Sequence, residues 1–261
     1  MRDVVTLDLG NSRLKLRRWR VRVGAAPELS ESATIPSGSE HVAQVLAAIQ
    51  GEPDRLALSS VAAAAVEAEL VRGLSARFGA RFSAHPAPPL ELDVRAPERV
   101  GRDRVFAALG AWERFRASAI VVDAGTCATV DALAAPRVNG GRPRFLGGAI
   151  APGPALLARA LASGGARLFA VDTKPGARAL GRDTEEALRA GVVVGFRGAV
   201  RELVLEVGRE AGLENAPVVW TGGAAELLLS PSLFPARENR VELDLVHHGL
   251  LAALDAERAL A

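Results

Sequence analysis

A short pattern occurs twice in this chain, and it constrains the fold more than any other feature. Residues 4–9 form an apolar run that leads into Asp8-Leu9-Gly10-Asn11, and residues 120–122 lead in the same way into Asp123-Ala124-Gly125-Thr126. An apolar run before such a Gly turn predicts a strand that enters a tight reversal. Two more extended segments follow each turn, and helices follow these. The repeat therefore predicts an α/β fold of two duplicated lobes with a central cleft.

Hydrophobic periodicity predicts the elements of the first lobe. We expect strands at residues 4–9, 14–23, 29–35 and 55–61, and helices at residues 40–49, 63–78 and 102–115. The apolar alternation changes phase near residues 17–18, which predicts a bulge or a break in the second strand. Residues 80–94 are rich in proline, so we expect a loop with short extended pieces there.

The second lobe follows the same order with longer helices. We expect strands at residues 120–122, 128–133, 145–150 and 218–221, and helices at residues 154–161, 184–211, from 222 onward, and 247–260. Asp183 is the expected N-cap of the longest helix, with Glu186 three residues later. Gly191, Gly195 and Gly198 lie along that helix and predict close packing against another backbone. The lobes should span residues 1–117 and 118–261, the last helix being a candidate to pack back on the first lobe.

Composition argues against several classes of protein. The net charge is only +2 and no dense basic block is present, so nucleic acid binding has little support. A single cysteine, Cys127, excludes a disulfide within the chain and favours a reducing, cytoplasmic location. The chain has no signal-like N-terminal run and no apolar stretch of about 18 residues, so we expect no membrane span.

Both Asp-x-Gly turns have the chemistry of a phosphate site. Glycine lets the backbone approach a phosphate closely, and the amides and hydroxyls around the turns can donate to its oxygens. Asp8 can hold Mg²⁺ and Lys15 can reach a terminal phosphate, while Asp123 and Thr126 repeat this logic in the second turn. An ordinary hairpin is the alternative for either turn alone, and their pairing favours the phosphate site.

A third motif, Gly101-Arg102-Asp103-Arg104, opens the predicted helix at residues 102–115. A helix N-terminus attracts anions, and an arginine there can bind a carboxylate. Asp103 can accept the proton of an attacking hydroxyl, although phosphoryl transfer depends mainly on positioning and electrostatics. A helix-capping aspartate with flanking ion pairs is the alternative.

The remaining motifs are less specific. Residues 147–153 and 221–223 read as glycine turns from strand to helix, where either a ligand or tight packing can explain the glycines. No Gly-x-Gly-x-x-Gly loop occurs, and residues 176–181 have the Walker spacing without the Lys-[Ser/Thr] that must follow. Cys127 is expected to be a small buried residue. The histidines form no metal-binding pattern with it and are interpreted as structural or surface residues: His41, His85, His247 and His248.

Together these motifs resemble those of the type III pantothenate kinases, within the acetate kinase/sugar kinase/Hsp70/actin superfamily. Asp8-x-Gly-Asn-Ser-x-x-Lys15 and Asp123-x-Gly-Thr-x-x-Thr129 are similar to the two phosphate motifs, and Gly101-x-Asp-Arg104 to the pantothenate motif. Residues 147–153, 181–184 and 221–223 match as well, so the resemblance covers nearly the whole chain in order. Arg102 and Asp183 depart from the common pattern, which leaves the finer shape of the pantothenate pocket open.

The resemblance implies two RNase H-like lobes of the actin-like ATPase type, and a role for each motif. Asp103 would be the catalytic base, and pantothenate would contact Gly101, Arg102, Asp103, Arg104 and Thr184. ATP would contact Asp8, Leu9, Gly10, Asn11, Ser12, Arg13, Leu14, Lys15 and Thr126. Asp123 would hold a monovalent cation, K⁺ or NH₄⁺, and Asp8 would hold Mg²⁺. Family members place the pantothenate pocket near a homodimer interface, so Thr184 would come from the second subunit.

The sequence thus predicts ATP-dependent phosphorylation of pantothenate, the first step of coenzyme A biosynthesis. Two alternatives stay open. The Arg102 departure allows a kinase for another small hydroxy acid or sugar, and a non-catalytic nucleotide-binding regulator would also retain the turns.

Overall fold

The computed structural model describes residues 1–36, 41–229, 233–234 and 237–260, which form two compact units. The first unit contains Met1–Leu90, Ala96–Phe115 and Asp244–Ala261, and the second contains Glu91–Arg95 and Arg116–Leu243. The last helix of the chain therefore belongs to the first unit. No helix in the described part of the chain combines the length and apolarity needed to cross a membrane.

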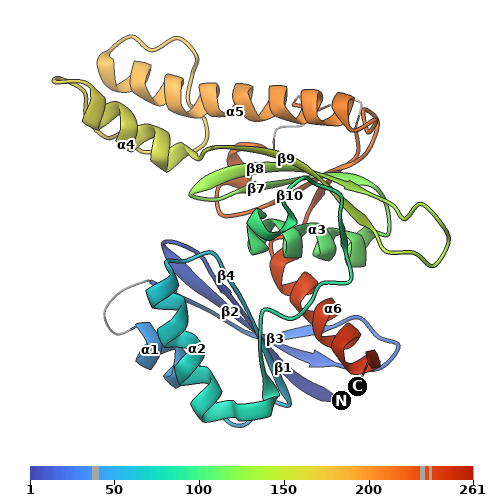
Figure 1. The fold of residues 1–261 in the computed structure, drawn as a ribbon. Coiled ribbons are helices and arrows are strands. Elements are labelled where there is room, and N and C mark those ends of the chain that lie inside the picture. Colours follow the sequence, from blue (N-terminus) through green and yellow to red (C-terminus); the bar gives the residue numbers. More distant parts are fainter. Residues whose placement is uncertain (37–40, 230–232, 235–236, 261) are drawn as a thin grey trace. The chain divides into compact units, whose positions relative to one another are not determined.

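The first unit contains a five-stranded sheet in the order β3-β2-β1-β4-β5 (Figure 1). Its strands are β1 (Arg2–Leu9), β2 (Arg13–Val21), β3 (Glu28–Pro36), β4 (Arg55–Ser60) and β5 (Phe82–Ala84). β1, β2 and β3 pair in antiparallel fashion, whereas β4 is parallel to both β1 and β5. The register between β2 and β3 shifts at Arg18 and Trp19, as the change of phase predicted.

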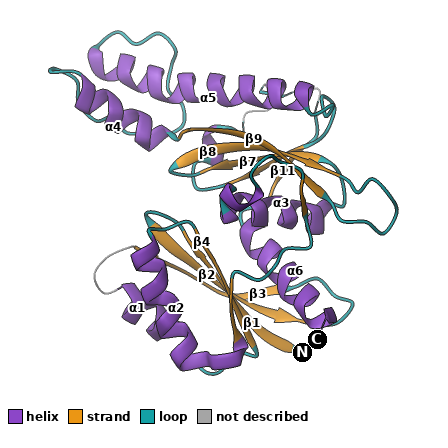
Figure 2. Cartoon of the chain, in the orientation of Figure 1, coloured by secondary structure: helices purple, strands orange, loops and turns teal. Residues whose placement is uncertain are grey.

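Two pairs of helices cover this sheet. Leu7, Leu9 and Leu58 face the core beneath α1 (His41–Ala48) and α2 (Ala64–Phe78), and Figure 2 shows these two helices together on one side of the strands. Each fully buried leucine there stabilises the fold by roughly 1.5–3 kcal/mol. The other face meets α3 (Arg102–Phe115) and α6 (Leu245–Leu260).

Two glycines allow α3 and α6 to cross at close range. A Cβ atom on Gly110 would collide with the carbonyl group of Leu245, and one on Gly249 would collide with that of Phe106. These helices come from distant parts of the sequence. Their crossing fixes the N-terminal turn of α3, which carries Asp103, against the sheet that carries Asp8.

The second unit repeats the topology of the first. Its sheet has the order β11-β10-β7-β8-β9-β6, with β7, β8 and β9 antiparallel and β10 parallel to β7 and β11. The strands are β6 (Glu91–Leu92), β7 (Ala119–Ala124), β8 (Cys127–Ala134), β9 (Arg144–Pro152), β10 (Val218–Thr221) and β11 (Asn239–Val241). Apart from the short β6, the strand order and directions match the first sheet, which confirms the predicted duplication.

The helices of the second unit are α4 (Pro154–Gly164) and the long α5 (Thr184–Glu210), which lie side by side in Figure 1. α5 packs Val193, Phe196 and Val200 against the sheet. Asp183 caps α5 as predicted, since its Oδ1 atom accepts a hydrogen bond of 2.8 Å from the amide of Glu186. Single turns of 3₁₀ helix complete the chain: η1 (Gly79–Arg81), η2 (Pro97–Arg99) and η3 (Ala225–Leu227).

Three expectations were wrong in the second unit. Within the described residues 222–229 the chain forms the single 3₁₀ turn η3 and no α-helix. Gly147 and Gly148 lie inside β9 and not in a turn, because Gly148 packs against the backbone of β8. Cys127, expected to be buried, is exposed. The close packing predicted at Gly191, Gly195 and Gly198 stays a prediction, because that side of α5 faces away from the sheet and no described atom of this chain lies within 4 Å of a Cβ built there.

Candidate functional site

The first turn closes directly after β1. The amide of Gly10 donates a 3.0 Å hydrogen bond to the carbonyl oxygen of Arg13, so residues 11 and 12 form the exposed tip. Asp8 lies just inside the strand and is only 9% exposed. Its Oδ2 atom is 3.9 Å from Nζ of Lys15, its pairing partner on β2. The ammonium group thus compensates the buried carboxylate across the hairpin.

The start of α3 holds the carboxylate of Asp103. Oδ1 of Asp103 accepts a 2.8 Å hydrogen bond from the amide of Arg104, and a Cβ atom on Gly101 would lie 2.6 Å from the same oxygen. Residue 101 therefore has to lack a side chain if the carboxylate is to keep this position. Arg102 is exposed, whereas Asp103 and Arg104 are half-buried.

The electrostatics of Asp103 suit a proton acceptor. Desolvation by burial raises the pKa of Asp103 above its ordinary value, although the Arg104 amide and the positive charges of Arg104 and Lys15 pull it down. Lys15 therefore acts on both Asp8 and Asp103. The structure brings these three residues, which lie far apart in the sequence, into one charged cluster within the first unit.

Few side chains of the described residues could act as ligands of a divalent cation. The described residues contain no group of three or more His, Cys, Asp or Glu side chains that could hold a metal ion. Mg²⁺ is commonly bound through one or two carboxylates, with substrate phosphates and water supplying the other ligands. The single carboxylate of Asp8, beside a turn whose tip is exposed, fits that kind of shared coordination.

The second turn is built on the same plan. The amide of Gly125 donates to the carbonyl oxygen of Cys127 at 3.0 Å, and the amide of Gly153 donates to that of Thr126 at 3.0 Å. Thr126 is exposed at the tip, while Asp123 is half-buried. Gly222 has a φ of 89° and lies so close to the carboxylate of Asp123 that a Cβ there would collide with it. Residue 222 therefore has to be glycine if the Asp123 carboxylate is to keep this position.

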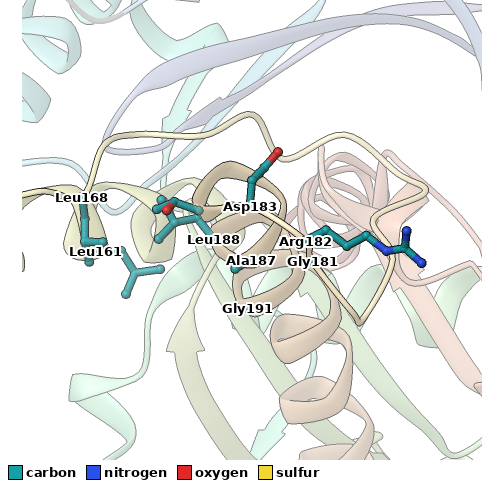
Figure 3. A pocket seen from close by; sticks show the side chains of 9 residues that line it. Leu161, Leu168, Gly181, Arg182, Asp183, Ala187, Leu188 and Gly191 are labelled. Atoms are coloured by element: carbon teal, nitrogen blue, oxygen red, sulfur yellow. The ribbon is translucent and has the colours of Figure 1, made fainter.

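Thr184 is exposed at the first turn of α5, beside a cavity of about 620 Å³ in the second unit. Figure 3 shows Leu161, Leu168 and Leu188 on one side of this cavity and Arg182 extending away from them. The predicted site residues are divided between the two units. Residues 8–15 and 101–104 belong to the first unit, whereas Thr126 and Thr184 belong to the second.

Sequence reasoning missed polar groups near these motifs. Nε2 of His85 lies 2.8 Å from Oε1 of Glu67, and His85 adopts a positive φ of 57°. Burial alone would raise the pKa of Glu67, but hydrogen bonds from His85 and Ser60 and the charge of Arg102 together hold it below its ordinary value. Glu67 and His85 are not in a recognisable motif, so no sequence signal joined them. Ser59, on β4, was missed for the same reason.

His247 is structural, as expected. Nδ1 of His247 is 2.8 Å from the hydroxyl of Thr6, which also accepts a 2.8 Å hydrogen bond from Nε1 of Trp19. Desolvation by burial holds the pKa of His247 well below its ordinary value, with help from the charges of Arg17 and Lys15. The imidazole is therefore neutral in the folded protein.

Comparisons with known proteins agree with these motifs. A family model described as type III pantothenate kinase matches residues 4–206. The type III pantothenate kinase of Thermomicrobium roseum is 39% identical over 168 residues, which are 64% of this chain and 60% of that protein. The one from Thermus thermophilus is 38% identical over 76% of each chain. The one from Mycobacteroides abscessus is 30% identical over 94% of this chain and 87% of its own.

A solved structure resembles the fold over the full length. The inorganic polyphosphate/ATP-glucomannokinase from Arthrobacter sp. strain KM matches 100% of both chains with a TM-score of 0.53 and 14% identity. At this identity the likeness concerns the fold alone, and it agrees with two RNase H-like lobes of the actin-like ATPase type.

Proposed function

The chain belongs to the type III pantothenate kinase family, and we propose that it transfers the γ-phosphoryl group of ATP to the primary hydroxyl of pantothenate. The product would be 4′-phosphopantothenate, and the reaction would be the first step of coenzyme A biosynthesis. The observation that carries this proposal is the cluster of Asp8, Lys15 and Asp103, because it combines a phosphate turn with a desolvated carboxylate.

Asp103 is the proposed base. A carboxylate accepts the proton of an attacking hydroxyl more effectively when its pKa lies nearer the working pH, and burial shifts Asp103 in that direction. Its hydrogen bond from the Arg104 amide fixes one oxygen and leaves the other for the substrate hydroxyl. In this proposal Gly101, Arg102 and Arg104 contact pantothenate, with Arg104 on its carboxylate and Thr184 completing the pocket.

The two turns would hold ATP, through residues 8–15 and Thr126. The tip of the first turn is exposed, and backbone amides there would donate to phosphate oxygens, while Lys15 adds a positive charge. Asp8 would hold Mg²⁺, and Asp123, whose carboxylate lies against Gly222, would hold K⁺ or NH₄⁺. When bound, these cations would neutralise charge on the transferred phosphoryl group.

The proposal includes a homodimer. One side of α5 carries Gly191, Val194, Gly195 and Gly198, all exposed within this chain, and small residues allow close approach of a second helix. Sedimentation equilibrium measures the oligomeric state directly. If Thr184 reaches the site of the partner, mixing inactive Asp103→Asn subunits with Thr184→Arg subunits restores activity, because one site in each mixed dimer carries both native residues. Failure of two folded dimeric variants to complement would contradict the shared site.

A coupled ADP-release assay with pantothenate, ATP, Mg²⁺ and K⁺ tests the central proposal. We expect turnover with the wild-type chain, and a loss of about 10²–10⁴-fold with Asp103→Asn. A panel of small hydroxy acids and sugars under the same conditions tests the substrate. Preference for another member of the panel would reassign the substrate, and ATP binding without any product would indicate a regulator.

A further inference from the structure

A row of polar side chains crosses three strands of the first sheet at the level of the phosphate turn. Lys15 of β2 pairs with Asp8 of β1, and Asp8 pairs in turn with Ser59 of β4. Residues that pair across a sheet point to the same face. Leu7 and Leu58, one position earlier in the same register, enter the core beneath α1 and α2. Ser59 therefore lies beside Asp8 on the opposite face.

The hydroxyl of Ser59 needs an acceptor. Ser59 is 0% exposed, and its Oγ atom has no hydrogen-bond partner. Buried hydroxyls in native proteins nearly always have a partner, because an unpaired one loses its hydrogen bonds to water without compensation. The paired residue Asp8 lies on the neighbouring strand, about 4.8 Å away as in other β-sheets, and its carboxylate is on the same face.

The second sheet repeats this row. Asp123 of β7 pairs with Thr129 of β8 and with Thr221 of β10, and Thr221 is only 3% exposed. In both lobes, therefore, the strand next to the motif aspartate (β4 or β10) carries a buried hydroxyl residue at the position that pairs with that aspartate. The flanking sequences differ, since Ser60 follows Ser59 and Gly222 follows Thr221. The feature that both lobes keep is the hydroxyl next to the carboxylate.

We propose that Ser59 is a positioning residue of the phosphate site, whose hydroxyl donates a hydrogen bond to one carboxylate oxygen of Asp8. That bond orients the carboxylate, so that its other oxygen faces the magnesium–ATP complex. The inference rests on the proposed role of Asp8. Ser59 does not itself contact the ligand, since it is fully buried.

The test compares Ser59→Ala with Ser60→Ala. Ser60 is the matched control, because it is the next residue of β4 and is only 5% exposed. It faces the other side of the sheet, where its hydroxyl accepts a hydrogen bond of 3.3 Å from the amide of Ala62. ATP binding is titrated calorimetrically at several Mg²⁺ concentrations, and ADP release is measured over the same range. For Ser59→Ala we expect the Mg²⁺ concentration at half-saturation to rise about threefold to tenfold, the usual effect of losing one hydrogen bond. Ser59→Thr retains the hydroxyl and should stay within about twofold of the wild type.

The readouts separate positioning from a structural role. Ser59→Ala and Ser60→Ala each remove one buried hydroxyl of β4 and its hydrogen bond, so both should fold and melt slightly below the wild type. Only Ser59→Ala should also raise the Mg²⁺ requirement. An unchanged Mg²⁺ requirement in folded Ser59→Ala would overturn the proposal. The calorimetric titration needs no acceptor substrate, so it tests Ser59 even if pantothenate is not phosphorylated. If the wild-type chain binds no ATP at any Mg²⁺ concentration, both proposals fall.

Discussion

Replacement of Gly101 by alanine tests the geometry around Asp103 most directly. The new Cβ atom would lie 2.6 Å from Oδ1 of Asp103, whereas ordinary contacts begin at about 3.4 Å. The carboxylate must therefore move by about 0.8 Å, the difference between these distances. It can do so by rotation of its own side chain, because the nearest atom is the flexible end of an aspartate. The backbone is not strained, since Gly101 does not have a positive φ.

The expected effect is larger on the rate than on stability. A displacement of about 1 Å at a reacting group can lower a rate by about 10²-fold, so we expect kcat to fall by roughly 10- to 100-fold. Loss of the hydrogen bond from the Arg104 amide to Asp103 should cost about 1 kcal/mol of stability. The smaller conformational freedom of alanine in the unfolded chain offsets about 0.4–1 kcal/mol of that loss.

The ADP-release assay and thermal unfolding measure the two effects. Gly164→Ala is the control, because none of the described atoms lies within 4 Å of a Cβ built there, and it should leave kcat unchanged. The effects of Gly101→Ala and Asp103→Asn on kcat should not add, because both act through one carboxylate. A kcat of Gly101→Ala within twofold of the wild type, or full additivity with Asp103→Asn, would refute this account of the site.

Three further predictions concern charge and packing. Because desolvation raises the pKa of Asp103, its ionised form destabilises the fold at neutral pH, and Asp103→Asn should therefore melt at a higher temperature. For the same reason, kcat/KM of the wild type should fall with decreasing pH through a pKa above the ordinary aspartate value. His247 stays neutral in the folded state but protonates in the unfolded chain below about pH 6.5. The free energy of unfolding measured with urea should therefore fall by up to about 1.4 kcal/mol per pH unit below that pH. His247→Gln should remove this contribution to the pH dependence. A methyl group on Gly110 would collide with the Leu245 carbonyl, so Gly110→Ala should cost about 1–3 kcal/mol in the same measurement, and an unchanged urea midpoint would contradict the α3–α6 crossing.

Local patterns in the sequence predicted most of the fold. The strands of both sheets, apart from short ones such as β11, follow from apolar runs that end at turn residues, and the cap of α5 follows from Asp183 and Glu186. Such signals depend on neighbours within a few residues, which is why they can be read directly. The failures have one common cause. The exposure of Cys127 and the position of Gly148 inside β9 depend on what packs against these segments, and local sequence does not contain that information.

The sequence by itself therefore determined the two Asp-x-Gly turns, the duplicated order of strands and the family to which the motifs belong. Only the tertiary structure decided that Lys15 acts on both Asp8 and Asp103, that α6 returns to the first unit, and that Ser59 lies buried beside Asp8. The physical reason is that strand register and helix crossings bring together residues that are distant along the chain. Burial then raises the pKa of Asp103, which no local motif specifies.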